Sequence, residues 1–191
     1  MLKLETIKSN ITFIVPSIGR MTLSNSIESL IKQTNPNWKC IIIFDGVEKI
    51  TFKDHRIRTI KIKKTGTRLA NGQAGLVRNE GIKLVRTEWI GFLDDDDTVQ
   101  PNYVNDLFKK YSNNDFVVWR MRYSHGLIIP APGSKDLIFG NVGISFCYKN
   151  KFKNLLFDCN RDGEDYDFLQ KLLSLSQNYK ITEESYYNVR G

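Results

Sequence analysis

The sequence predicts an α/β protein with an open, mostly parallel twisted sheet and helices on both faces. Over the first two-thirds of the chain, short strand-like segments rich in Ile, Val and Phe alternate with helical segments, the pattern that produces strand–helix–strand crossovers. The 191 residues are enough for one domain with a sizeable core. We therefore expect residues 1–191 to form a single domain, which is either complete or a piece of a longer protein.

Strands are expected where β-branched and aromatic residues form short segments that end at turn-forming or acidic residues. Pro16 closes the first segment, Asp45-Gly46 ends the second, and four aspartates follow the fourth directly. These four segments cover residues 11–15, 39–44, 56–62 and 88–93. Two later strands are expected over residues 116–123 and 141–148, and a last extended segment over residues 179–189.

Helices are expected where apolar residues recur at spacings of three and four. Thr22 is positioned to cap the first helix, whose apolar residues are Leu23, Ile27, Leu30 and Ile31. A polar segment from Lys64 to Gly75 contains three glycines and predicts a loop that leads into a second helix, ending near Val85. Pro101 suits the first turn of a third helix, and residues 164–175 predict an amphipathic fourth.

The apolar segments and the cysteines favour a cytoplasmic protein. The longest uninterrupted apolar segment, residues 40–44, is far shorter than the roughly 20 residues of a membrane helix, and residues 1–8 lack the apolar core of a secretory signal. Cys40, Cys147 and Cys159 are odd in number and far apart, which favours free thiols in a reducing compartment. With two histidines and no cysteine near either, we expect no structural zinc site.

The net charge of +7, from 28 basic and 21 acidic residues, makes a nucleic acid one candidate partner. The densest basic clusters, residues 61–64 and 149–153, are short. A solvated strand edge and a solvated loop explain them, since interleaved lysines also discourage edge-to-edge pairing of strands. A basic surface suits a phosphate-bearing small molecule or an anionic membrane equally well. We therefore expect no nucleic-acid partner, leave peripheral membrane contact open, and keep a basic nucleic-acid-binding module as an alternative.

Three polar segments follow predicted strands, and ligands of open α/β sheets bind beyond the carboxyl ends of the strands. These segments, expected on one edge of the sheet, are residues 16–20, 45–46 and 94–97. Four consecutive aspartates repel one another unless a cation or a helix N-terminus compensates. One interpretation is that Asp97 caps the next helix and the others are solvated. The other is a hard cation, Mg²⁺ or Mn²⁺, that bridges phosphate oxygens of a nucleotide.

Two further segments are candidates for the same site. The glycine-containing segment from Gly72 to Glu80 enters a helix, whose first turn can hold an anion, and Arg78 would point back toward that anion. Arg78 could instead be an exposed residue paired with an acidic side chain. Asp165 could deprotonate an attacking hydroxyl, or it could simply be stabilised by the dipole at the start of its helix.

Taken together, these segments resemble the family 2 glycosyltransferases, which have the GT-A fold. The segments that carry the resemblance occur in family order and span roughly residues 11 to 175: Val15-Pro16-Ser17 with Arg20, Phe44-Asp45-Gly46, Val77 to Ile82, Trp89 to Asp97, and Gly163-Glu164-Asp165. At Gly46 many members carry a second acidic residue. The ordered set is specific for the family and does not distinguish one member from another.

The resemblance implies an inverting enzyme that moves a hexose from a nucleotide-sugar donor, with a UDP-sugar favoured, to a hydroxyl of a glycan, lipid-linked or protein-linked acceptor. Asp165 would be the general base. Asp94 and Asp96 match the family's D-x-D pair, which binds Mn²⁺ or Mg²⁺. Because Asp95 and Asp97 have the same spacing, the pair could also be these two residues. The residues expected to bind the nucleotide sugar are Pro16, Ser17, Arg20, Asp45, Arg78, Asp94 and Asp95.

Other functions and the acceptor site are less well defined by the sequence. A sugar-phosphate nucleotidyltransferase needs a glycine-rich loop after its first strand, where this chain has one glycine, Gly19. A non-catalytic nucleotide-sugar binder remains an alternative. For the acceptor, Trp119, Tyr123, His125 and residues 140–143 are candidates. Trp119 could stack on a sugar, but in an alternating strand such a residue is more often part of the core.

Overall fold

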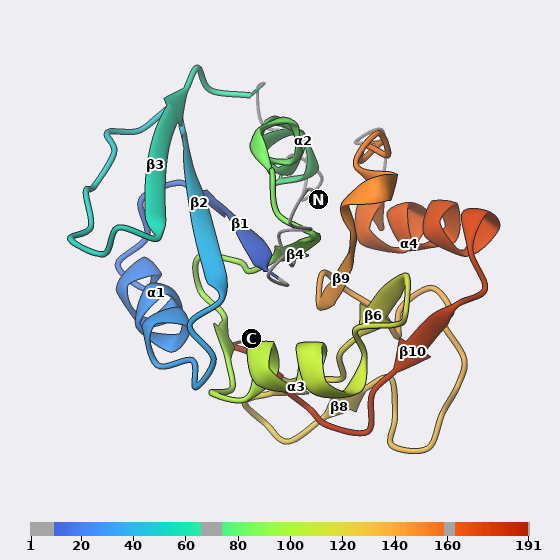
Figure 1. The fold of residues 1–191 in the computed structure, drawn as a ribbon. Helices are drawn as coiled ribbons and strands as arrows, with labels where there is room; N and C mark the ends of the chain where they lie inside the picture. The colour runs from blue at the N-terminus through green and yellow to red at the C-terminus, as the bar shows by residue number, and fades with distance from the viewer. Residues whose placement is uncertain (1–9, 66–73, 159–162, 191) are drawn as a thin grey trace, which may run out of the picture.

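A central sheet of seven strands forms in the computed structural model, which describes residues 10–65, 74–158 and 163–190 (Figure 1). The strand order is β10 (Tyr179–Ile181), β6 (Phe116–Val118), β9 (Phe146–Lys149), β4 (Trp89–Phe92), β1 (Ile11–Ser17), β2 (Trp38–Asp45) and β3 (Ile57–Ile62). Only β9 runs antiparallel to its neighbours within this described sheet. The open, mostly parallel α/β sheet is therefore confirmed. The expectations for the N-terminus, Gly66, Gly72 and Cys159 fall outside the described residues.

Helices cover both faces of this sheet. Figure 1 shows α2 (Ala74–Leu84) and α4 (Glu164–Leu175) on one face, and α1 (Leu23–Ile31) and α3 (Tyr103–Lys110) on the other. Successive residues of a strand point to opposite faces. Accordingly, Ile14 of β1 lies against α2 at Gly81, whereas Phe13 packs edge-on against Tyr103 of α3, with ring centroids 5.3 Å apart.

Gly81 lets α2 lie close to the sheet. A Cβ atom at this position would lie 2.4 Å from Cγ2 of Ile14 and 3.0 Å from Cδ1 of Ile43. The close packing of α2 on the sheet thus requires glycine at this position, although glycine interrupts the helical pattern of the sequence. Close packing of α2 on β1 and β2 brings Arg78, about one turn earlier, over the carboxyl ends of these strands.

The first strand is longer than the sequence predicts, since β1 continues through Pro16, which is paired in register with Ile43 of β2. The carbonyl of Ile14 faces β4 and accepts from the backbone N–H of Leu93. Pro16, two residues later, faces the same side, where the pairing with β4 has already ended at Phe92. A proline can therefore occupy this strand without removing a hydrogen bond of the sheet.

The expected Thr22 cap is wrong, and so is the alternative in which Asp97 caps the third helix. Thr22 does precede α1, but its side chain makes no capping hydrogen bond, and its buried hydroxyl lacks a partner within the described chain. Asp97 does not cap α3, whose first flanking residue is Asn102. The Asp97 carboxylate accepts instead from the backbone N–H of Arg190 at 3.0 Å.

A second, four-stranded sheet was not predicted. Its order is β5 (Thr98–Val99), β11 (Tyr187–Val189), β7 (Met121–Tyr123) and β8 (Ile128–Ile129). The single strand expected over residues 116–123 is divided between the two sheets. β6 pairs with β9, and the backbone N–H of Trp119 extends this pairing to the carbonyl of Ser145, whereas β7 pairs with β11. Next to Trp119, the buried guanidinium of Arg120 donates to the carbonyls of Pro130 and Ser134. Residues 116–121 are all buried across the break, so the sequence pattern does not reveal it.

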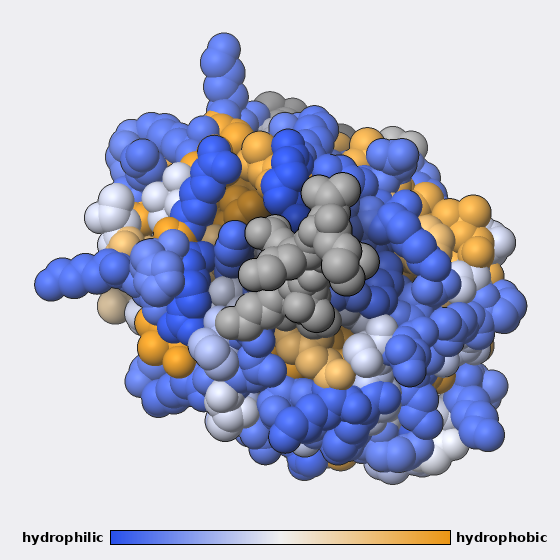
Figure 2. All heavy atoms as spheres, viewed as in Figure 1, coloured by the Kyte–Doolittle hydropathy of each residue, from blue (hydrophilic) through white to orange (hydrophobic). Residues whose placement is uncertain are grey.

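Hydrophilic residues cover most of the face seen in Figure 2, and hydrophobic ones form separate patches. Within the described ranges, no helix combines the length and the apolar character needed to cross a membrane. Cys40 and Cys147 are buried free thiols, as expected.

Candidate functional site

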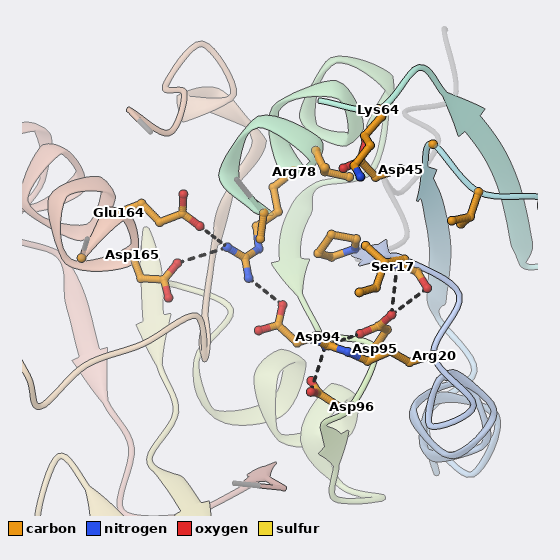
Figure 3. Close-up of a pocket in the computed structure, with 17 residues that line it drawn as sticks. Ser17, Arg20, Asp45, Lys64, Arg78, Asp94, Asp95, Asp96, Glu164 and Asp165 are labelled. Carbon is orange, nitrogen blue, oxygen red and sulfur yellow. Dashed lines mark hydrogen bonds and ion pairs between the residues drawn. The ribbon is translucent and has the colours of Figure 1, made fainter. Parts of the chain in front are cut away.

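A cavity of about 760 Å³ opens at the carboxyl ends of β1, β2 and β4, between the first turns of α2 and α4. Figure 3 shows its acidic and basic side chains pointing toward one another across this space. All nine site residues expected from the sequence line the cavity: Pro16, Ser17, Arg20, Asp45, Arg78, Asp94, Asp95, Asp96 and Asp165. Seven of them share this location because parallel strands end at the same edge, and Arg78 and Asp165 are contributed by α2 and α4.

Asp95 ties the end of β1 to the acidic segment. Its carboxylate accepts from the Ser17 hydroxyl at 2.7 Å, from the backbone N–H of Ile18 at 3.3 Å and from Nη1 of Arg20 at 2.9 Å. Its side chain is only 4% exposed. Both carboxylate oxygens are therefore used inside the protein, and Asp95 positions the wall of the cavity.

Alternate residues of the acidic segment face the cavity. Asp94 and Asp96 line it and keep 32% and 38% of their side chains exposed, whereas Asp95 and Asp97 are buried. Burial raises the pKa of Asp97 to about 7, and the neighbouring carboxylates of Asp94 and Asp96 act in the same direction. Asp94, Asp95 and Asp96 thus all line the cavity, but only Asp94 and Asp96 keep a substantial part of their side chains exposed.

Arg78 connects the acidic segment to the start of α4. Its guanidinium is 3% exposed and donates to Asp94 at 2.6 Å, to Glu164 at 2.9 Å and to Asp165 at 3.4 Å. Burial alone would lower the pKa of Arg78, but the carboxylates of Asp94, Asp165 and Glu164 more than offset it and the pKa is raised. The alternative of an exposed Arg78 is therefore wrong, and this cation orients three carboxylates around the cavity.

Asp165 keeps a partly exposed carboxylate in this network, with 26% of its side chain accessible. Burial raises its pKa to about 7; the Arg78 cation acts against this shift, and the charges of Asp94 and Glu164 add to it. A carboxylate with a pKa near neutrality can accept a proton and release it again at physiological pH. The Asp165 side chain can thus exchange a proton near neutral pH.

At the opposite wall, the Asp45 carboxylate accepts from the backbone N–H of Thr65 at 2.6 Å and from its hydroxyl at 3.0 Å. Gly46 adopts a φ of +70°, and a Cβ atom there would lie 2.6 Å from Cβ of Lys64. A second acidic residue in place of Gly46 would collide with the residues that follow β3. Gly46 thereby brings Lys64 to the cavity.

Among residues 10–65, 74–158 and 163–190, no preformed group of three His, Cys, Asp or Glu side chains suits a metal ion. The carboxylates of Asp94 and Asp96 nevertheless share the cavity and offer hard oxygen donors. Mg²⁺ and Mn²⁺ sites often use one or two carboxylates and take their remaining ligands from substrate phosphates and water. The donor set therefore fits such an ion once a phosphate-bearing ligand is bound.

The sequence interpretation missed three residues. Glu164 accepts from both Arg78 and the backbone N–H of Gly75, at 2.9 and 3.0 Å, and so joins α4 to α2. Lys64 follows β3 at the cavity, although its cluster was interpreted as a solvated edge. Tyr187 accepts from the backbone N–H of Asp94 at 3.2 Å. The sequence held a signal for two of them: Glu164 is adjacent to Asp165, and Lys64 follows a predicted strand. It held none for Tyr187.

The acceptor candidates lie outside the residues that line the cavity. Trp119 is fully buried, stacks on Tyr186 with ring centroids 5.2 Å apart, and contacts the tilted ring of Tyr103 at 4.5 Å, so its interpretation as a core residue is confirmed. His125 is exposed in the turn before β8, with its ring 5.6 Å from that of Tyr123.

Comparisons with known proteins agree with this geometry. Residues 12–161 match the family model of glycosyl transferase family 2. The chain is 28% identical to the putative colanic acid biosynthesis glycosyl transferase WcaA of Escherichia coli strain K12, over 91% of this chain and 70% of that protein. It is 26% identical to the poly(ribitol-phosphate) beta-N-acetylglucosaminyltransferase TarP of Staphylococcus aureus strain N315, over 87% of this chain and 58% of that protein.

A solved structure shares the fold. The crystal structure of S. aureus TarS residues 1–349 in complex with UDP-GlcNAc superposes with a TM-score of 0.73 at 17% identity, and the match covers 95% of this chain and 58% of that one. The present chain thus spans little more than half the length of TarP and of this TarS fragment.

Proposed function

The chain belongs to glycosyl transferase family 2, and from this membership we propose that residues 1–191 form one catalytic domain that transfers a sugar from a nucleotide-sugar donor to an acceptor hydroxyl. One observation carries the proposal: a carboxylate with a pKa near 7, Asp165, shares a cavity with Asp45, Asp94 and Asp96. A base, a nucleotide wall and a diphosphate site are the three parts that such a transfer needs.

We place the donor across the cavity. Asp45 and Lys64 would hold the nucleoside at the ends of β2 and β3, with Pro16, Ser17 and Arg20 forming the floor. The UDP-GlcNAc complex of TarS supports a UDP-sugar as the donor. Asp94 and Asp96 would hold a Mn²⁺ or Mg²⁺ ion at the diphosphate, where such an ion neutralises the charge of the leaving group.

The proposed reaction inverts the anomeric carbon in one displacement. Asp165 accepts the proton of the acceptor hydroxyl while the oxygen bonds to the anomeric carbon, and the bond from that carbon to the diphosphate oxygen breaks with its electron pair. Arg78 lies between Asp94 and Asp165 and keeps the base and the diphosphate site at a fixed separation. The acceptor would be a glycan or a lipid-linked or protein-linked sugar, and the buried thiols Cys40 and Cys147 support a cytoplasmic location.

The basic clusters give little support to a nucleic-acid-binding module. Lys61 pairs with Glu48, Lys149 with Glu88, and Lys151 with Asp115. Neutralisation within the chain reduces the charge available to a phosphate backbone. A nucleic-acid-binding module also leaves the four adjacent aspartates without a role.

Calorimetric titration with UDP, GDP and dTDP, each with and without Mn²⁺, tests the proposal. We expect one nucleotide, UDP, to bind more tightly with Mn²⁺, and Asp96→Ala to lose that enhancement. Asp158→Ala is the matched control, because Asp158 is exposed, is paired with Lys171 and does not line the cavity. If the wild type binds none of the three nucleotides under either condition, the proposed function is wrong. Hydrolysis of the donor then separates an enzyme from a non-catalytic binder.

A further inference from the structure

An exposed aromatic side chain lies beside the proposed base. Phe139 is 65% exposed, although large apolar side chains are usually buried. Its ring packs edge-on against Tyr166, the residue after Asp165, with centroids 5.8 Å apart and an interplanar angle of 90°. One edge of the ring is thus held while much of its surface stays in contact with water.

The backbone around Gly163 is adapted to this ring. Gly163 lines the cavity and has a φ of +90°, which disfavours any side chain. A Cβ atom at Gly163 would lie 2.4 Å from Cε2 of Phe139. The Phe139 ring therefore lies directly against a residue of the cavity wall, two positions before Asp165.

The loop that carries Phe139 is held by its own hydrogen bonds. The Asn141 side chain accepts from the backbone N–H of Ile138 at 2.9 Å and donates to the carbonyl of Asp136 at 3.0 Å. The backbone N–H of Asn141 also bonds the carbonyl of Ile138 at 3.1 Å. This arrangement fixes the loop while Phe139 projects outward, so the ring is presented in a defined orientation.

We propose that Phe139, supported by Tyr166, is a stacking platform for a pyranose ring of the acceptor. The inference rests on the proposed function, because Asp165 must meet an acceptor hydroxyl. A pyranose has one face of C–H groups and a rim of hydroxyls. An aromatic ring can cover that face, while a hydroxyl on the rim reaches the neighbouring carboxylate. The platform thereby specifies a saccharide as the acceptor group next to the reacting oxygen.

Saturation-transfer NMR tests the platform with the methyl β-pyranosides of glucose, galactose and N-acetylglucosamine, in the presence of UDP and Mn²⁺. We expect saturation of the C–H face of at least one glycoside by the wild type. Phe139→Ala should weaken its apparent affinity by about fivefold, which is ~1 kcal/mol, and Phe139→Trp should retain it. Leu175→Ala is the matched control, since Leu175 is 57% exposed at the far end of α4.

Equal saturation of the glycoside by wild type and Phe139→Ala, or none by the wild type with any of the three glycosides, would overturn the platform. Binding of wild type but not Phe139→Ala to anionic phospholipid vesicles, with no glycoside saturation, would also overturn it in favour of a lipid surface. Calorimetry with UDP separates the two proposals. Phe139→Ala should bind UDP as the wild type does, whereas failure of the wild type to bind UDP would remove the proposed function while glycoside saturation still supported the saccharide site.

Discussion

Asp165 combines partial burial with a cationic neighbour, and both bear on its proposed role as the base. We expect Asp165→Asn to lower kcat by about 10²–10⁴-fold, the usual contribution of a general base. UDP affinity should change little, since Asp45 and the acidic segment lie on the opposite side of Arg78 (Figure 3). Steady-state kinetics and calorimetry on the same preparation measure both effects. Loss of UDP binding in step with turnover would show that Asp165 acts on the donor site instead.

The pKa of Asp165 also sets the direction of the pH dependence. Burial, Asp94 and Glu164 raise this pKa to about 7, above that of an ordinary aspartate, and Arg78 opposes the shift. A base works only when deprotonated, so kcat/KM should fall about tenfold per pH unit below that value and level off above it. A kinetic profile from about pH 5 to 8.5 measures this. A profile that is flat across pH 7 would contradict the assignment of Asp165 as the base.

At the scale of elements, the close approach of α2 to the sheet depends on Gly81. Gly81→Ala would place a methyl group 2.4 Å from Ile14 in the middle of the sheet. We expect a loss of ~1–3 kcal/mol in the free energy of unfolding, as overpacked cores show, although alanine is the better helix former. Urea denaturation of the wild type and the variant measures this loss of stability.

Lys83→Ala is the control for Gly81→Ala. Lys83 lies on the same helix, its side chain is 55% exposed, and its pairing with Glu80 is on the surface, so its loss should cost well under ~1 kcal/mol. Equal stability of the Gly81→Ala variant and the wild type would mean that α2 can move away from Ile14. In that case the position of Arg78 would not depend on close packing of the helix.

The elements whose own residues show a strand or helix pattern could be predicted from the sequence. The features that depend on contacts with distant residues could not. Strands β1 to β4 show apolar segments and the helices show their own periodicity. The shared strand-end edge accounts for seven of the nine predicted residues, and Arg78 and Asp165 reach the same cavity from α2 and α4. The extension of β1 through Pro16 depends on where β4 ends, 76 residues later. The division of residues 116–123 depends on the pairing of β6 with β9 and of β7 with β11, which come later in the chain. Local sequence contains none of these partners.

At the scale of the whole molecule, the second sheet supports the acidic segment from behind. Tyr187 of β11 accepts from the backbone N–H of Asp94, and the backbone N–H of Arg190 bonds Asp97; each contact joins residues 93 positions apart. Burial raises the pKa of Tyr187 well above its usual value, so its hydroxyl stays protonated. The last strand of the chain therefore fixes the backbone that carries Asp94 and Asp96.

Tyr187→Phe tests whether this long-range support reaches the ligand site. Removing the hydroxyl leaves Asp94 N–H without its acceptor, and we expect ~1 kcal/mol less stability. Groups that orient metal ligands typically change affinity about 10–100-fold, so Mn²⁺-dependent UDP binding should weaken by at least about tenfold. Tyr186→Phe is the matched control, because its hydroxyl bonds Asp106, outside the cavity. It should lose similar stability but keep its UDP affinity. Equal UDP affinities in the two variants would show that the second sheet stabilises the fold without positioning the acidic segment.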